Sequence, residues 1–114
     1  MNNALVAPIA LRAFEDSLPM ALMRARESVM RYFRPVLGEH DLTEQQWRVL
    51  RALRDAEAPM SVGELAERTF LLGPSLSRML ASMDERGVIE RATASDARRA
   101  EISISERGLE LVSE

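Results

Sequence analysis

One stretch of the sequence carries side chains typical of a nucleic-acid interface. It begins at Gly73-Pro74 and holds three serines and an arginine at exposed positions of an expected helix: Ser75, Ser77, Ser82 and Arg78. Serine hydroxyls can hydrogen-bond base edges or phosphates, and arginine can contact guanine through two hydrogen bonds. A helix N-terminus also favours a phosphate, so we expect these residues to bind DNA. The alternative is a solvated helix face, because serine is common in a first helical turn.

A second stretch, ASDARRAEISIS from Ala94 to Ser105, places Arg98 and Arg99 at the bend between two short expected strands. The negative potential of the DNA minor groove attracts arginine, so we predict that both residues contact DNA. We expect Asp96 to shape the loop by pairing with Arg98 or with a nearby backbone amide. The alternative is a charged turn that keeps an edge hairpin soluble.

The elements that must position these residues follow from periodicity, capping boxes and turn residues. Helices are expected from Ser17 to a point near Pro35, from Thr43 to Ala58-Pro59, from Ser61 to the turn at 69–72, and from Gly73 to Arg86. Gly87 caps the fourth helix, strands follow at 88–91 and 101–104, and Ser105 can cap one more helix. This order of elements predicts a winged helix-turn-helix.

The first helix carries two apolar lines. They comprise Leu18, Leu22, Ala25, Val29, Phe33 and Val36, and Met23, Met30 and Leu37. Two lines indicate that the helix packs on its own domain on one side and on a second subunit on the other. The alternative is a helix buried in its own core. Pro35 removes one backbone donor and is expected to kink or end the helix nearby.

Composition limits the remaining function classes. The 114 residues suggest one domain, which we expect at 16–114 after an N-terminal arm at 1–15. The sequence has no cysteine and one histidine, His40, so we expect no disulfide, metal or cofactor. Without a Gly-rich phosphate loop or a nucleophile elbow, an enzyme is not expected. We read no signal peptide or membrane segment and expect a cytoplasmic protein.

The stretches from Ser77 to Leu80, from Met83 to Arg91, from Asp96 to Arg99 and from Ile102 to Gly108 resemble the MarR family of bacterial regulators. The resemblance runs from about Leu18 to the last residue. It implies a mainly α, α+β winged helix-turn-helix with an N-terminal dimerisation helix and a two-stranded wing. It also implies a homodimer that binds a pseudo-palindromic operator in double-stranded DNA. Members continue with two more dimerisation helices, which we expect to be missing from this sequence.

Earlier segments are similar to the repressors of homoprotocatechuate (3,4-dihydroxyphenylacetate) degradation operons. These segments are Ser17–Leu22, Arg24–Glu27, Tyr32–Pro35 and Leu42–Arg48. The similarity implies repression of aromatic-catabolism genes that a small phenolic acid relieves. Two other functions stay open: a winged helix used for protein contact, and a MarR-type repressor that responds to a different organic effector.

A phenolic acid needs a cation for its carboxylate, polar partners for its hydroxyls and an apolar wall for its ring. Among residues near the first two helices, Arg48 can supply the cation, with Arg24 as the alternative. Ser28 and His40 are the expected hydroxyl partners, and Trp47 is the expected wall. The alternative places Trp47 in the core and His40 in a solvated loop.

Overall fold

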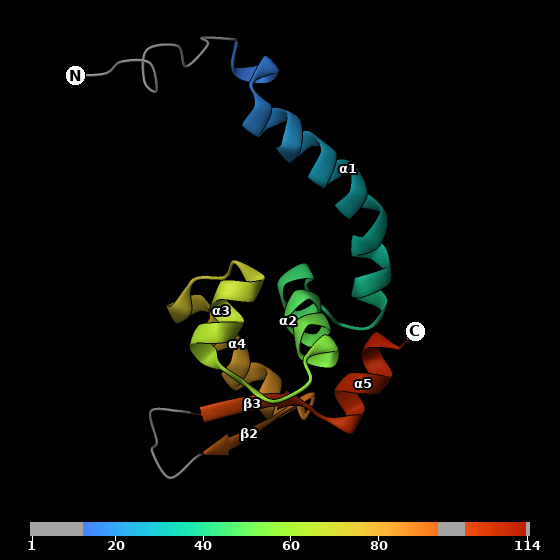
Figure 1. The fold of residues 1–114 in the computed structure, drawn as a ribbon. Helices are drawn as coiled ribbons and strands as arrows, with labels where there is room; N and C mark the ends of the chain where they lie inside the picture. Colours follow the sequence, from blue (N-terminus) through green and yellow to red (C-terminus); the bar gives the residue numbers. More distant parts are fainter. Residues whose placement is uncertain (1–12, 94–99, 114) are drawn as a thin grey trace, which may run out of the picture. The chain divides into compact units, whose positions relative to one another are not determined.

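The computed structural model describes residues 13–93 and 100–113 (Figure 1). Its elements are a short 3-10 helix, Phe14–Asp16, five helices and three strands: α1 Leu18–Glu39, α2 Glu44–Asp55, β1 Met60–Ser61, α3 Val62–Thr69, α4 Gly73–Arg86, β2 Ile89–Thr93, β3 Ala100–Ile104 and α5 Glu106–Val112. The chain divides into two compact units, one ending at Val36 and one beginning at Leu37. None of the described helices is both long enough and apolar enough to span a membrane.

The first helix ends shortly after Pro35. It continues through Pro35 and ends at Glu39, because one proline removes a single hydrogen bond and the rest of the last turn is intact. The amide of Leu42 then donates to the carbonyl of Leu37, and Asp41 takes the left-handed conformation with φ 54°. Residues 40–42 therefore turn the chain from α1 toward α2.

The apolar lines of α1 are largely exposed in this chain. Leu37 is the buried residue of the helix, whereas Leu22 and Val29 are 62% and 55% exposed. An exposed apolar face of this length is typical of a contact with another chain.

The caps of the second unit follow the predictions closely. Thr43 and Gln46 form a full capping box at the start of α2. Ser61 caps α3 by accepting the amide of Glu64, whose carboxylate in turn accepts the Ser61 hydroxyl at 3.1 Å. Gly87 ends α4 with φ 79°. The end of α2 was placed wrongly, because the helix stops at Asp55 rather than at Ala58-Pro59.

The sheet has one strand more than the sequence predicted. Strand β1 pairs antiparallel with β3, Met60 lying opposite Ile102, and the strand order is β1-β3-β2. Two residues are too few to show an alternating pattern, so this strand gave no signal in the sequence. The two-stranded hairpin of β2 and β3 was predicted correctly, with Ile89 opposite Ile104 and Thr93 opposite Ala100.

The core of the second unit lies between the helices and the sheet. Its fully buried apolar side chains come from α2, α3, α4 and β3: Val49, Leu50, Leu65, Leu76, Leu80, Met83 and Ile102, together with Val88. Leu76, Leu80 and Met83 form the buried stripe predicted for α4. On α3, Thr69 is buried beside Leu65, and its hydroxyl donates to the Leu65 carbonyl at 2.6 Å.

Helix α5 packs closely on the backbone at Val88, which directly precedes strand β2. Ser105 caps it by accepting the amide of Gly108 at 3.0 Å, as predicted. A Cβ atom on Gly108 would lie 2.2 Å from the carbonyl oxygen of Val88. Only glycine therefore allows α5 to approach the backbone this closely.

We predict that Gly108→Ala lowers the free energy of unfolding by about 1–3 kcal/mol, because the backbone must move to admit the methyl group. The matched control is Gly63→Ala on α3, where the nearest atom is the Ser61 hydroxyl oxygen at 4.0 Å. This change should be neutral or should stabilise by up to about 1 kcal/mol. Urea unfolding of both variants measures the difference, and equal effects would contradict the close packing of α5.

Candidate nucleic-acid interface

The predicted DNA-binding residues of α4 lie on the exposed side of the helix. At 3.6 residues per turn, Arg78 and Ser82 fall opposite the buried stripe, and Ser75 and Ser77 flank them. All four side chains are exposed. Within the described part of the chain, no carboxylate pairs with Arg78. The N-terminal half of α4 therefore presents a cation and hydroxyl groups to solvent.

The N-terminus of α4 is left without the groups that usually neutralise a helix start. Helices α2, α3 and α5 each have a Thr or Ser cap and an acidic residue in the first turn. Helix α4 begins after Leu72, which provides no side-chain cap, and its first turn has no acidic residue. The free amides and the helix dipole at this end favour an anion.

The other end of α4 is fixed by hydrogen bonds. The Arg86 guanidinium donates to the carbonyl oxygens of His40, at 2.7 Å, and of Asp41. The Ser105 hydroxyl donates to the carbonyl of Gly87 at 2.6 Å. These bonds hold the last turn of α4 against the turn after α1 and the start of α5. They fix the C-terminal end of the helix whose N-terminal half is exposed.

The predicted wing residues cannot be described in the same way. Asp96, Arg98 and Arg99 lie outside the described residues. The strands on either side, β2 and β3, are paired up to Thr93 and Ala100. The predicted contact of Arg98 and Arg99 with DNA, and the shaping role of Asp96, stay predictions.

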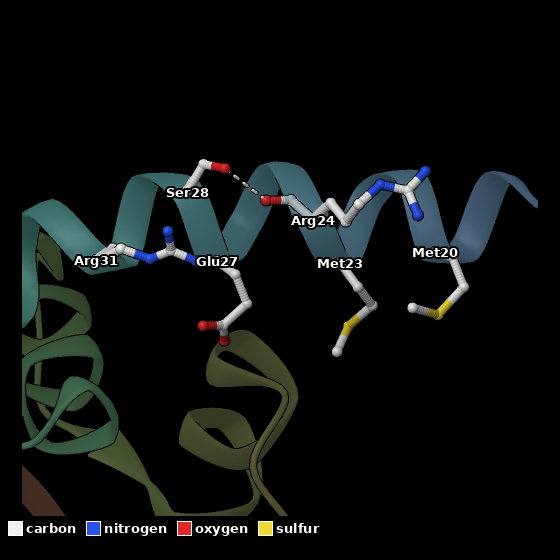
Figure 2. A pocket seen from close by; sticks show the side chains of 6 residues that line it. All are labelled: Met20, Met23, Arg24, Glu27, Ser28 and Arg31. Atoms are coloured by element: carbon white, nitrogen blue, oxygen red, sulfur yellow. Dashed lines mark hydrogen bonds between the residues drawn. The ribbon is translucent and has the colours of Figure 1, made fainter. Parts of the chain in front are cut away.

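Two of the predicted ligand-binding residues line one hollow on α1. Arg24 and Ser28 lie beside a surface hollow of about 420 Å³ whose other lining residues are Met20, Met23, Glu27 and Arg31. Figure 2 shows that all six side chains come from α1 and that Met20 and Met23 extend to the same side of it. The Ser28 hydroxyl donates to the Arg24 carbonyl at 2.9 Å, so its oxygen is left as an acceptor. The described residues offer no partner for the Arg24 guanidinium.

The other predicted ligand residues lie in the second unit, and each has partners there. The Arg48 guanidinium donates to the Thr69 carbonyl and to the Glu44 carboxylate, both at 2.7 Å. These bonds connect α2 to the C-terminal end of α3, where backbone carbonyls lack helical partners. Arg48 therefore has two structural partners, and its role as the cation of a ligand site stays a prediction.

His40 and Trp47 have different surroundings within the second unit. His40 lines a shallow depression of about 230 Å³ with Arg107, Glu110 and Leu111 of α5. Trp47 is half-buried and carries the Arg51 guanidinium over its ring, 5.5 Å from the ring centre. The predicted grouping of His40, Trp47 and Arg48 in one ligand site stays a prediction.

Four residues of the α1 hollow were not predicted: Met20, Met23, Glu27 and Arg31. Together with Arg24 and Ser28 they recur at spacings of three and four, which places them on one helix face. This spacing was visible in the sequence. Two exposed apolar residues before α4, Phe70 and Leu72, were also missed. Among the described residues, no group of three or more His, Asp or Glu side chains is placed to hold a metal ion.

An ion pair controls the charge of the α1 hollow. The two terminal nitrogens of Arg34 donate to the two carboxylate oxygens of Glu27, one to each, both at 2.9 Å. These hydrogen bonds, and then the positive charge of Arg34, lower the pKa of Glu27 from its usual value near 4.5. Glu27 is therefore ionised. Arg34 pairs with it through hydrogen bonds, and Arg26 and Arg31 add charge attraction.

We predict that the Glu27 carboxyl titrates below its usual pKa. Because the folded-state pKa is depressed, the ion pair contributes fully above the usual value and is lost as the pH falls through the folded value. Arg34→Gln should raise the pKa of Glu27, and the control Arg26→Gln should raise it less, since Arg26 is 3.9 Å away. NMR titration of the side-chain carboxyl carbon measures this. An unchanged pKa in Arg34→Gln would contradict the pairing.

Comparisons with known proteins agree with this geometry. The MarR family model matches residues 40–100. The homoprotocatechuate degradative operon repressor of Escherichia coli is 45% identical over 95 residues, which cover 82% of this chain and 63% of the repressor. This chain therefore spans a little under two thirds of the length of that relative.

Two solved structures show the same fold. NadR in complex with 4-hydroxyphenylacetate has a TM-score of 0.78 and 31% identity, covering 90% of this chain and 72% of that one. The repressor CouR bound to a 23-mer DNA duplex has a TM-score of 0.76 and 28% identity, covering 90% and 74%. The family model spans more than half of the chain, and the winged helix-turn-helix agrees with it. The chain belongs to the MarR family.

Proposed function

We propose that this chain is the DNA-binding part of a transcriptional repressor that controls an aromatic-catabolism operon and that a phenolic acid releases from its operator. The observation that carries this proposal is the exposed N-terminal half of α4, with Arg78 and three serines beside an uncapped helix start. A catalytic role is not part of it, and the expected place of action is the cytoplasm.

The geometry of α4 supports insertion into the major groove with its N-terminus first. We expect Ser75 and the free amides of the first turn to contact phosphates, and Arg78 to contact a base edge. Glu85 follows on the same face two turns later, and its negative charge disfavours close contact with DNA at that end. The proposed contacts are therefore Ser75, Ser77, Arg78 and Ser82, with Arg98 and Arg99 at the wing.

The apolar surface of α1 supports a homodimer. Leu18, Leu22, Val29, Phe33 and Val36 are each at least 50% exposed. Burying such a face against a second copy removes apolar area from water. A two-fold dimer presents two α4 helices to successive major grooves, about 34 Å apart, which matches a pseudo-palindromic operator.

The α1 hollow supports the site for the effector. Arg24 can bind the carboxylate, Ser28 can accept a ligand hydroxyl, and Met20 and Met23 can contact the ring. The E. coli relative is named for homoprotocatechuate, and NadR was solved with 4-hydroxyphenylacetate. An acid that favours a spacing of the two α4 helices unfit for DNA releases the operator by its difference in affinity for the two states.

The DNA-binding face is tested by Arg78→Ala in the full-length protein. We expect a loss of about 1–3 kcal/mol in specific binding and relaxed preference at one operator position, because a base contact is removed. Fluorescence anisotropy with the duplex from immediately upstream of the gene measures it. The control is Arg107→Ala, an exposed arginine on α5. Equal losses in both variants would refute a base-specific role for Arg78.

The effector site is tested by comparing the two arginines first considered for it. Arg24→Gln should leave DNA binding intact and raise the 3,4-dihydroxyphenylacetate concentration needed for release about tenfold or more, since a charged hydrogen bond is lost. Arg48→Met should lower the midpoint of urea unfolding, because the bonds to Glu44 and Thr69 are lost. If Arg48→Met alone impaired release, the site would lie on α2 instead.

A further inference from the structure

Two exposed apolar residues lie in the turn that leads into α4. Phe70 is 90% exposed and Leu72 is 77% exposed, whereas Leu71 between them is half-buried. The turn therefore directs Leu71 toward the protein and leaves its two neighbours in solvent. Both exposed residues lie within three residues of the helix start that we propose enters the major groove.

Neither residue suits the backbone position that it occupies. Phe70 ends α3 in the left-handed conformation, with φ 59° and ψ 32°, where glycine or asparagine is preferred. Leu72 is the N-cap residue of α4 and makes no capping hydrogen bond, where Ser, Thr, Asp or Asn is preferred. Both residues disfavour the local structure, and their exposure shows that core packing does not explain them.

Residues that break local rules without a packing gain are expected at functional sites. We propose that Phe70 and Leu72 form an apolar contact with the 5-methyl group of thymine in the operator. This inference rests on the proposed function, since it adds a specificity contact beside the α4 helix. The surface is continuous with the helix start, and the thymine methyl is the apolar group that the major groove offers.

Two substitutions separate this role from a structural one. Leu72→Ser introduces a capping side chain, and Phe70→Gly introduces the residue that the left-handed position prefers. Both variants should therefore unfold at a temperature a few degrees higher than the wild type. Both should bind the operator more weakly, because the apolar contact is lost. A purely structural role predicts the first effect without the second.

The thymine methyl is tested directly with DNA. The full-length protein is titrated against the duplex from upstream of its gene, prepared with thymine or with uracil, which lacks the methyl group. We expect the wild type to lose at least about fourfold in affinity on uracil DNA, the value of one buried methyl. The Leu72→Ser variant should bind thymine DNA more weakly than the wild type does. Its affinity should fall little further on uracil DNA. The control Leu109→Ser, on α5, should behave as the wild type.

Three outcomes would overturn the proposal. Wild-type affinity of both variants on thymine DNA would show that the residues do not contact it. An equal further loss on uracil DNA in wild type and Leu72→Ser would place the methyl contact elsewhere. A change of oligomeric state in Leu72→Ser, with unchanged DNA binding, would assign the residues to a protein interface. Absence of specific DNA binding by the wild type would instead refute the proposed function itself.

Discussion

The burial of one face of α4 is the constraint on which the site depends. Leu76, Leu80 and Met83 are almost entirely removed from water, and their position fixes the rotation of the helix about its axis. Because the helix has 3.6 residues per turn, this rotation places Arg78 and Ser82 outward. The bonds of Arg86 and Ser105 fix the C-terminal end. A polar surface of defined position thus follows from an apolar contact on the opposite side.

The fold was largely predictable because its signals are local. Capping residues such as Thr43 and Ser105, Gly87 as a left-handed cap and the spacing of Leu76 and Leu80 each depend on a few neighbouring residues. Strand β1 was missed because its two residues are defined only by pairing with β3.

The candidate site was less predictable, since residue type does not reveal which side chains are already engaged. Arg48 has the charge that a carboxylate needs, yet Thr69 and Glu44 occupy its guanidinium. Arg24, considered second, lines a hollow with Ser28. The DNA-binding residues of α4 were easier to identify, because solvent exposure on an amphipathic helix follows from its apolar spacing. Phe70 and Leu72 were missed because hydrophobic residues in a turn give no periodic signal.

The central claim is that this chain binds operator DNA specifically and that a phenolic acid weakens this binding. The most direct test is a fluorescence anisotropy titration of the full-length protein with DNA from immediately upstream of its gene. Titrations at several salt concentrations, each with and without 3,4-dihydroxyphenylacetate, separate the two parts of the claim. We expect tight binding that weakens steeply with salt and that the acid weakens further. Equal affinity for this duplex and for a scrambled one, unaffected by the acid, would contradict the account.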